Sequence, residues 1–339
     1  MIQARKLALA ALAASAFGAT AQAQAPLTYS SWVPPTHHLT IWQANWAADV
    51  EKATGGRVKF QGLPKAPAAP PGTFDAVRDG LMDLSYVTAS YTPARHILPL
   101  MAELPGAGET AEINSVAYSR IHWKYFQKLG EYKGVKLLAV WTHGPGQMFT
   151  KKQINSLSDF QNLKIRTGGG ISAEVITALG GSPFFKPAPE SYELLNSGVA
   201  DGVFFPLESI VSFKLDKVIG QGTIFPGGLY SSSFGFFINE DKWNKLAKQD
   251  QDIIEKFSGE YAARSNGKSW DTADKVGLDA LKAAGANIVT ADAAMRADAQ
   301  KRSAPIIDAW IKKASVKLPN AKAVLDEFHG LLKRVAQGK

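Results

Sequence analysis

The chain has 339 residues, a formal net charge of +8 and no cysteine. The absence of cysteine excludes disulfides and thiolate chemistry. The Lys and Arg residues are scattered and form no run of the kind that binds nucleic acid. A chain of this length can form two domains with separate cores.

Residues 1–25 are predicted to be a secretory signal. Arg5 and Lys6 precede an apolar run at 7–19, and Ala-x-Ala sequences end at Ala23 and Ala25. The run falls short of the roughly 18 apolar residues of a membrane span, and no cysteine follows for lipid attachment. Removal of the two basic residues leaves a charge of 8 − 2 = +6. We therefore expect an exported, soluble protein of the periplasm.

The first part of the chain alternates short strands with helices. Trp42, Trp46 and Val50 lie about one helical turn apart, and two glycines follow them at 55–56. A helix–glycine–strand pattern then occurs twice, and Gly80 and Asp83 have the same spacing as Gly198 and Asp201. Such patterns occur in ordinary α/β connections, but the matched spacing favours two α/β domains built alike. The predicted elements are strands at 27–32, 57–60, 84–87 and 202–205 and helices at 40–54, 74–79 and 190–197.

The rest of the chain continues the alternation and becomes helical toward its end. We expect an α/β fold in which helices cover both faces of parallel or mixed sheets. The predicted elements are strands at 135–141, 162–166, 232–238 and 287–289, helices at 171–179, 241–264 and 268–284, and Ala-rich helices after these.

Arg166 is the last residue of a predicted strand, and three glycines follow it at 168–170. Open α/β sheets bind ligands at the carboxyl ends of their strands. A guanidinium matches a carboxylate with two parallel hydrogen bonds, and the following helix N-terminus adds positive potential. By residue type alone, a carboxylate site and a surface arginine beside a flexible turn remain equally open.

Six stretches, in this order, resemble the substrate-binding subunits of the tripartite ATP-independent periplasmic (TRAP) transporters, the DctP family. The resemblance implies a periplasmic-binding-protein-like two-domain fold with a hinge and a long helix that spans both domains. It also implies a receptor that closes over an organic acid, and that Arg166 holds the ligand carboxylate. The stretches are VEKATGGRV (50–58), VRDGLMDL (77–84), LSDFQNLKIR (157–166), LGGSP (179–183), GVADG (198–202) and FINEDKWNKL (237–246).

The resemblance also implies how the chain is divided. We expect a first α/β domain at 26–146 with about 232–270, and a second at 147–231 with about 285–339. The long helix is expected at about 268–284.

Two departures from the family pattern bear on the ligand. Gln147 stands nearest to a second arginine of the family, and it supplies no charge, which favours a monocarboxylate. Phe205 stands where the family often has a substrate-contacting asparagine. Because successive strand residues face opposite ways, we expect one of Phe204 and Phe205 to face the cleft, although both could be core residues. An aromatic wall suits an apolar or aromatic acid.

Other candidate ligand contacts follow strands or lie beside Arg166: they are Trp32, His37, His38, Thr88, Thr167 and Ser232. One of the adjacent histidines is expected to contact substrate while the other is solvated. They could also bind a metal, but no Asp, Glu or Cys ligand pattern lies near them in sequence, and we predict no metal or cofactor. Glu208 is expected to be solvated rather than paired with a buried arginine.

The leading hypothesis is a binding protein, because we find no nucleophile elbow, zinc motif or phosphate loop. Its expected partners are a small organic acid and the membrane subunits of a TRAP permease, with no nucleic acid, and it is expected to be a monomer. One alternative is a periplasmic enzyme that acts on a small carboxylic acid with His37 or His38 as base. The other is a ligand-sensing receptor.

Overall fold

The computed structural model describes residues 25–339. The predicted signal sequence, apart from Ala25, lies outside the described residues. Within the described range, none of the helices has both the length and the hydropathy of a membrane span.

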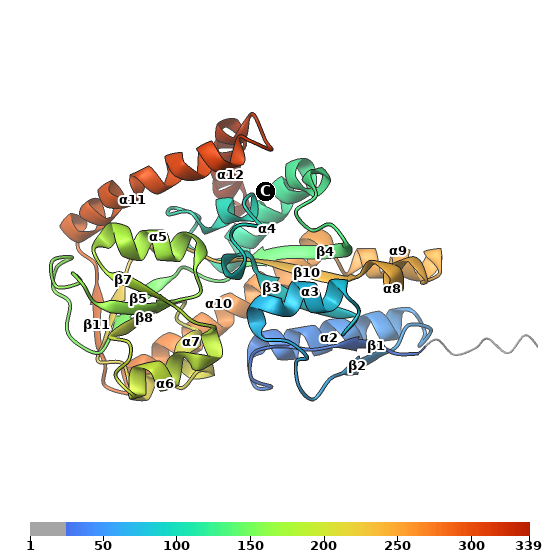
Figure 1. Ribbon diagram of the computed structural model, residues 1–339, viewed down its shortest axis with the longest axis horizontal. Helices are drawn as coiled ribbons and strands as arrows, with labels where there is room; N and C mark the ends of the chain where they lie inside the picture. The colour runs from blue at the N-terminus through green and yellow to red at the C-terminus, as the bar shows by residue number, and fades with distance from the viewer. Residues whose placement is uncertain (1–24) are drawn as a thin grey trace, which may run out of the picture.

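Two mixed β-sheets lie side by side in residues 25–339, each with its own helices (Figure 1). β10 pairs antiparallel with β3 and β4, while β5 pairs antiparallel with β8 and β9. The first sheet, in spatial order, is β2 (Phe60–Gly62), β1 (Leu27–Tyr29), β3 (Leu84–Thr88), β10 (Ser233–Asn239) and β4 (Val135–Thr142). The second is β11 (Asn287–Thr290), β9 (Gln221–Ile224), β5 (Gln147–Thr150), β8 (Gly202–Phe205), β6 (Lys164–Thr167) and β7 (Ser182–Phe185).

Helices surround each sheet, and the predicted two-domain α/β fold with a long helix is confirmed. We call the first sheet with its helices the first unit, and the second sheet with its helices the second unit. Helices of the first unit are α2 (His38–Ala53), α3 (Thr73–Arg78), α4 (Ala111–Ile121), α8 (Glu240–Asn244) and α9 (Lys248–Lys256). Those of the second are α5 (Gly170–Leu179), α6 (Ser191–Asn196), α7 (Ser209–Ser212) and α11 (Ala293–Ala314). α12 (Ala321–Ala336) packs against α4, and α11 packs against α5.

The long helix is α10 (Gly259–Ala283), which contacts α4 and β4 in the first unit and α7 in the second (Figure 1). The stretch predicted to be helical at 241–264 is mostly helical but not continuous, because the backbone is extended at Ala247 and Ser258 and separates α8, α9 and α10. α10 therefore begins nine residues before the predicted start at 268.

Glycines let α10 touch both units closely. A Cβ on Gly267 would lie 2.5 Å from the Cα of Glu112 in α4. A Cβ on Gly277 would overlap the backbone oxygen of Leu207, just before α7. No larger residue fits either contact without a shift of backbone.

Carboxylates of α10 bind backbone N–H groups of both units. Asp271 accepts hydrogen bonds from the N–H groups of Ala111 (2.7 Å) and Glu112 (3.1 Å) at the start of α4. One turn later, Asp274 accepts from the N–H of Glu208 (2.7 Å). The two acids thus fix one helix to both units.

The chain passes from the first sheet to the second through residues 143–146 and returns through residues 225–232. We call these two segments the crossovers. They run antiparallel: Gly146 N–H donates to Tyr230 O (2.8 Å), and Leu229 N–H donates to Gly146 O (2.9 Å). A Cβ on Gly146 would overlap the Tyr230 ring, so glycine is needed for this approach.

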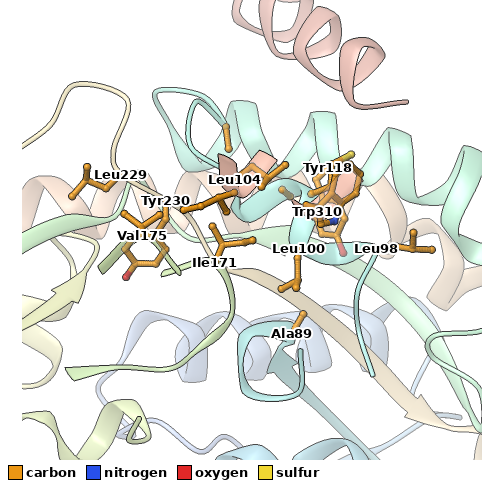
Figure 2. Packing of buried hydrophobic residues seen from close by; sticks show 14 of the residues in the cluster. Ala89, Leu98, Leu100, Leu104, Tyr118, Ile171, Val175, Leu229, Tyr230 and Trp310 are labelled. Atoms are coloured by element: carbon orange, nitrogen blue, oxygen red, sulfur yellow. The ribbon is translucent and has the colours of Figure 1, made fainter. Parts of the chain in front are cut away.

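Apolar side chains of the two units meet in one buried cluster (Figure 2). Leu100 and Leu104 precede α4, while Ile171 and Val175 belong to α5. Tyr230, from a crossover, belongs to the same cluster. The contact between the units is therefore built partly of core residues.

Candidate functional site

A cavity of about 50 Å³ is lined by residues of both units. Trp32 follows β1 and Thr88 ends β3, and both belong to the first unit. Arg166 and Phe205 lie at the ends of the parallel strands β6 and β8 of the second. The cavity thus lies where open α/β sheets bind ligands, at the carboxyl ends of strands.

Arg166 presents a buried guanidinium to this cavity, with only 2% of the residue exposed. Its Nε–H and one Nη2–H donate to the backbone oxygen of Lys186 at 2.9 and 2.7 Å. The guanidinium carbon lies 4.4 Å from the centre of the Phe205 ring, a cation–π contact. Lys186 leaves three N–H groups on Nη1 and Nη2, and the Tyr91 hydroxyl is also hydrogen-bonded to this guanidinium.

The charge of Arg166 has no ion-pair partner in the part of the chain that the structure describes. Burial lowers its pKa, and the nearby phenols of Tyr91 and Tyr230 oppose that change. Because a buried charge without a counter-ion is costly, an anionic ligand would complete the site.

Aromatic side chains line the cavity in a series of contacts that begins at Arg166 and ends at Tyr230. We call this series the aromatic lining. Its last member, Tyr230, lines the same cavity as Arg166. The distances between successive ring centres are 5.5 Å from Phe205 to Phe213, 5.7 Å from Phe213 to His37, 5.9 Å from His37 to Trp270, 5.7 Å from Trp270 to His143 and 5.4 Å from His143 to Tyr230.

His37 lines the cavity, but both its ring nitrogens have protein partners. The N–H of Leu39 donates to Nδ1 (3.1 Å) at the start of α2, so Nε2 carries the proton of the neutral ring. That Nε2 lies 3.2 Å from Oε1 of Glu208 in the second unit. Burial keeps the pKa of His37 well below its usual range and raises that of Glu208 to about 7.

His37, His38 and Glu208 bring possible metal-ligand atoms within 4.8 Å of one another. A nitrogen that carries a proton cannot coordinate a metal, so the Leu39 N–H bond makes His37 a poor ligand. His38 places Nδ1 2.9 Å from Oγ of Ser269 and does not line the cavity. The group fits a hydrogen-bonded contact between the units better than a metal site.

The expectation that Glu208 is solvated is wrong, because its residue is 2% exposed. Oε2 accepts a hydrogen bond from Ser209 (3.2 Å), and Oε1 accepts one from Ser212. These hydroxyls and His37 replace the water that the carboxyl group would otherwise need.

The cavity brings together seven of the ten predicted ligand contacts. Gln147 lies outside its lining: its amide accepts from Phe225 N–H (2.7 Å) and donates to Phe225 O (3.3 Å). Thr167 also lies outside, with Oγ1 bonded to Ser172 and to Gly169 N–H (3.1 Å). These contacts do not favour ligand roles for Gln147, Thr167 or His38. The seven that line the cavity are Trp32, His37, Thr88, Arg166, Phe204, Phe205 and Ser232.

Phe204 and Phe205 belong to different buried clusters, as their alternation along β8 requires. Phe204 stacks between Phe160 and Tyr230 and is 1% exposed, yet it still touches the cavity. Phe205 faces the guanidinium of Arg166. Phe205 therefore lies closer than Phe204 to the guanidinium that would bind a ligand carboxylate.

Sequence reasoning missed several lining residues: Tyr91, His143, Phe213 and Trp270. His143 directly follows β4, so the strand-end argument that selected Thr88 could also have selected it. Trp270 lies in the middle of α10, where nothing in the helical pattern distinguishes a ligand contact from a core residue.

The sequence matches one known protein family and a related protein over most of its length. The model of the family "Bacterial extracellular solute-binding protein, family 7" matches residues 29–313. The outer membrane transporter protein TsaT of Comamonas testosteroni is 29% identical over 327 residues, 96% of each chain.

Solved structures resemble the whole described fold. A TRAP periplasmic solute-binding protein of Bordetella bronchiseptica, with bound (R)- and (S)-mandelate, is 46% identical with a TM-score of 0.89. The match covers 92% of this chain and 99% of that one. A marine metagenome TRAP solute-binding protein, with 3-hydroxybenzoate, is 26% identical with a TM-score of 0.85, covering 91% and 98%. The chain belongs to family 7 of the bacterial extracellular solute-binding proteins.

Proposed function

We propose that this protein is an extracytoplasmic receptor that binds an aromatic monocarboxylate and delivers it to a TRAP-type permease. The observation that carries the proposal is the buried, unpaired guanidinium of Arg166 at one point of the aromatic lining. The mandelate and 3-hydroxybenzoate in the two similar receptors support it.

Binding would use the free edge of the guanidinium. Lys186 O holds the Nε side of Arg166, which leaves Nη1 and Nη2 to bind both oxygens of a carboxylate. The aromatic lining would then enclose an apolar ring. Exclusion of water strengthens the ion pair, because the effective dielectric constant falls.

Closure would bring the two units together around the ligand. We place the hinge at the crossovers and α10, with domains at 26–146 and 147–231 and the later segments divided between them. Tyr91, whose hydroxyl accepts from Ala188 N–H (3.0 Å), and His37 with Glu208 would hold the closed form. The permease would recognise that form, which the ligand stabilises.

The similar receptor from Bordetella bronchiseptica is periplasmic by its description. For this chain we propose export to the periplasm through the N-terminal segment and action as a monomer without nucleic acid. Size-exclusion chromatography of a periplasmic extract checks both the oligomeric state and the location.

The test is a thermal-shift panel on residues 26–339. Benzoate, mandelate and phenylacetate should raise the melting temperature; at about 100 times its Kd a ligand stabilises by about 2.7 kcal/mol. Benzamide, which lacks the charge, is the matched control and should give no shift. Shifts only with dicarboxylates or sugar acids would reject the aromatic ligand, and no shift with any acid would reject the receptor.

The same complex tests the alternatives. Chromatography of the released ligand should recover the acid unchanged, whereas turnover would indicate an enzyme. Uptake of the acid by vesicles that contain the permease distinguishes delivery from sensing.

A further inference from the structure

His143 lies in the first crossover and is 6% exposed. Its Nδ1 lies 2.5 Å from the backbone oxygen of Gly144. Because a carbonyl oxygen can only accept, Nδ1 must carry the proton. The other ring nitrogen, Nε2, is therefore an acceptor with a free lone pair.

No residue in 25–339 donates a hydrogen bond to Nε2 of His143. The structure does not seal this atom from solvent either. His143 lines the cavity, where a bound ligand would lie. His37, in contrast, has both nitrogens occupied by Leu39 and Glu208. Burial lowers the pKa of His143 to about 4, which keeps the ring neutral and the lone pair available near pH 7.

His143 is close to the carboxylate site in the aromatic lining. Its ring stands edge-on to Tyr230, with centres 5.4 Å apart, and His143, Tyr230 and Arg166 line the same cavity. On its other side is Trp270, at 5.7 Å. A ligand held by Arg166 and enclosed by this lining thus presents a substituent to an acceptor that would otherwise be buried without a partner, which is unfavourable.

We propose that His143 determines specificity by accepting a hydrogen bond at Nε2 from a hydroxyl group of the ligand. The protein would then prefer hydroxylated aromatic acids to their deoxy counterparts. This inference rests on the proposed function, in which the carboxylate binds Arg166. Mandelate and 3-hydroxybenzoate, found in the similar receptors, both carry such a hydroxyl group.

Calorimetric titration of residues 26–339 with two ligand series tests the direction of the hydrogen bond. The series are benzoate, 3-hydroxybenzoate and 3-methoxybenzoate, and phenylacetate, mandelate and O-methylmandelate. In at least one series the hydroxyl should lower Kd roughly tenfold relative to the parent acid. The methoxy group cannot donate, so its acid should bind no better than the parent. An equal gain from hydroxyl and methoxy groups would overturn the proposal.

Variants then assign the effect to His143. His143→Phe keeps an aromatic ring but has no acceptor, so the ratio of the parent acid's Kd to the hydroxylated acid's Kd should fall to about 1. His143→Gln keeps a side-chain acceptor and should retain part of the preference. A hydroxyl preference that persists in His143→Phe would contradict the proposal.

The ligand series on the unmodified protein remains decisive if His143→Phe does not fold. Parent and hydroxylated acids that bind equally would overturn the role of His143 and leave the proposed function intact. Failure of every aromatic acid to bind would overturn both.

Discussion

Arg166 is positioned before any ligand is present. Lys186 O holds one edge of its guanidinium, and the Phe205 ring lies against its face. These contacts partly offset the cost of burying the charge. They also reduce the side-chain freedom that binding would otherwise remove, which favours affinity.

Arg166→Lys is expected to weaken binding of aromatic acids at least hundredfold. Lysine keeps the charge but cannot bind Lys186 O and a carboxylate with one planar group. Titration calorimetry measures the change, with melting temperature as the check on folding. Arg95→Lys, at a half-exposed residue that pairs with Asp75, is the matched control and should leave Kd unchanged. An unchanged Kd for Arg166→Lys would remove this residue from the site.

Phe205→Asn is expected to weaken the binding of benzoate or mandelate by about tenfold or more, because it removes an aromatic wall and the contact with Arg166. A small polar acid such as glycolate should lose less. Competition titrations give, for each acid, the ratio of the variant's Kd to the original Kd, and the two ratios are compared. Phe185→Asn, at a residue 61% exposed on β7, serves as control. Equal losses for both acids would exclude Phe205 from specificity.

At this scale, position along a strand predicts which side chains reach the cavity. Phe205 and Thr88 end strands, Arg166 is the last but one residue of β6, and all three line the cavity. Gln147 and Thr167 also lie at strand ends, but nearby backbone groups bind their side chains. Such competition depends on the fold of Phe225 and Gly169 around them, which no local pattern encodes.

Among the elements, α10 connects both units through its glycines and acids. The sequence predicted a long helix but not its start, which the extended backbone at Ser258 sets. The contacts of Gly277 with Leu207 and of Asp274 with Glu208 join segments far apart in the chain. Only the folded structure brings these groups together.

Gly277→Ala is expected to destabilise the protein by about 1–3 kcal/mol and to weaken ligand binding. Its Cβ would overlap a backbone oxygen, so α10 must move away from the segment before α7. Thermal unfolding and titration measure both effects. Gly330→Ala in α12 has room, with 3.4 Å to the nearest atom, an Arg334 side-chain nitrogen, and should be neutral or stabilising. Equal stability of the two variants would contradict the contact.

For the whole molecule, buried carboxyl groups lie where separate segments meet. Glu103 accepts hydrogen bonds from Ser90 (2.9 Å) and from the hydroxyl of Ser233 (2.8 Å). Burial raises the pKa of Glu103 to about 7, that of Glu208 to about 7 and that of Asp274 to about 8. The folded protein therefore binds protons that the unfolded chain has released.

This difference gives stability a definite dependence on pH. A carboxyl group with a raised pKa stabilises the fold fully below its unfolded value, and the contribution is lost as pH rises through the folded value. Buried histidines, including His37 and His143, have lowered pKa values and act in the opposite direction. Their effect ends near pH 6.5, where histidine in the unfolded chain titrates. Above that pH the carboxyl groups dominate.

The free energy of unfolding should therefore fall from pH 6.5 to 8.5, by up to about 1.4 kcal/mol per pH unit for each proton involved. Asp274→Asn keeps an oxygen for the Glu208 N–H but removes the titrating proton, so the curve should flatten, most clearly between pH 7 and 8.5. Urea unfolding at a series of pH values measures the slope. Asp279→Asn, at a side chain 78% exposed on the same helix, should leave the slope as it was. If Asp274→Asn follows the original curve, the carboxyl group of Asp274 does not contribute to the pH dependence of stability.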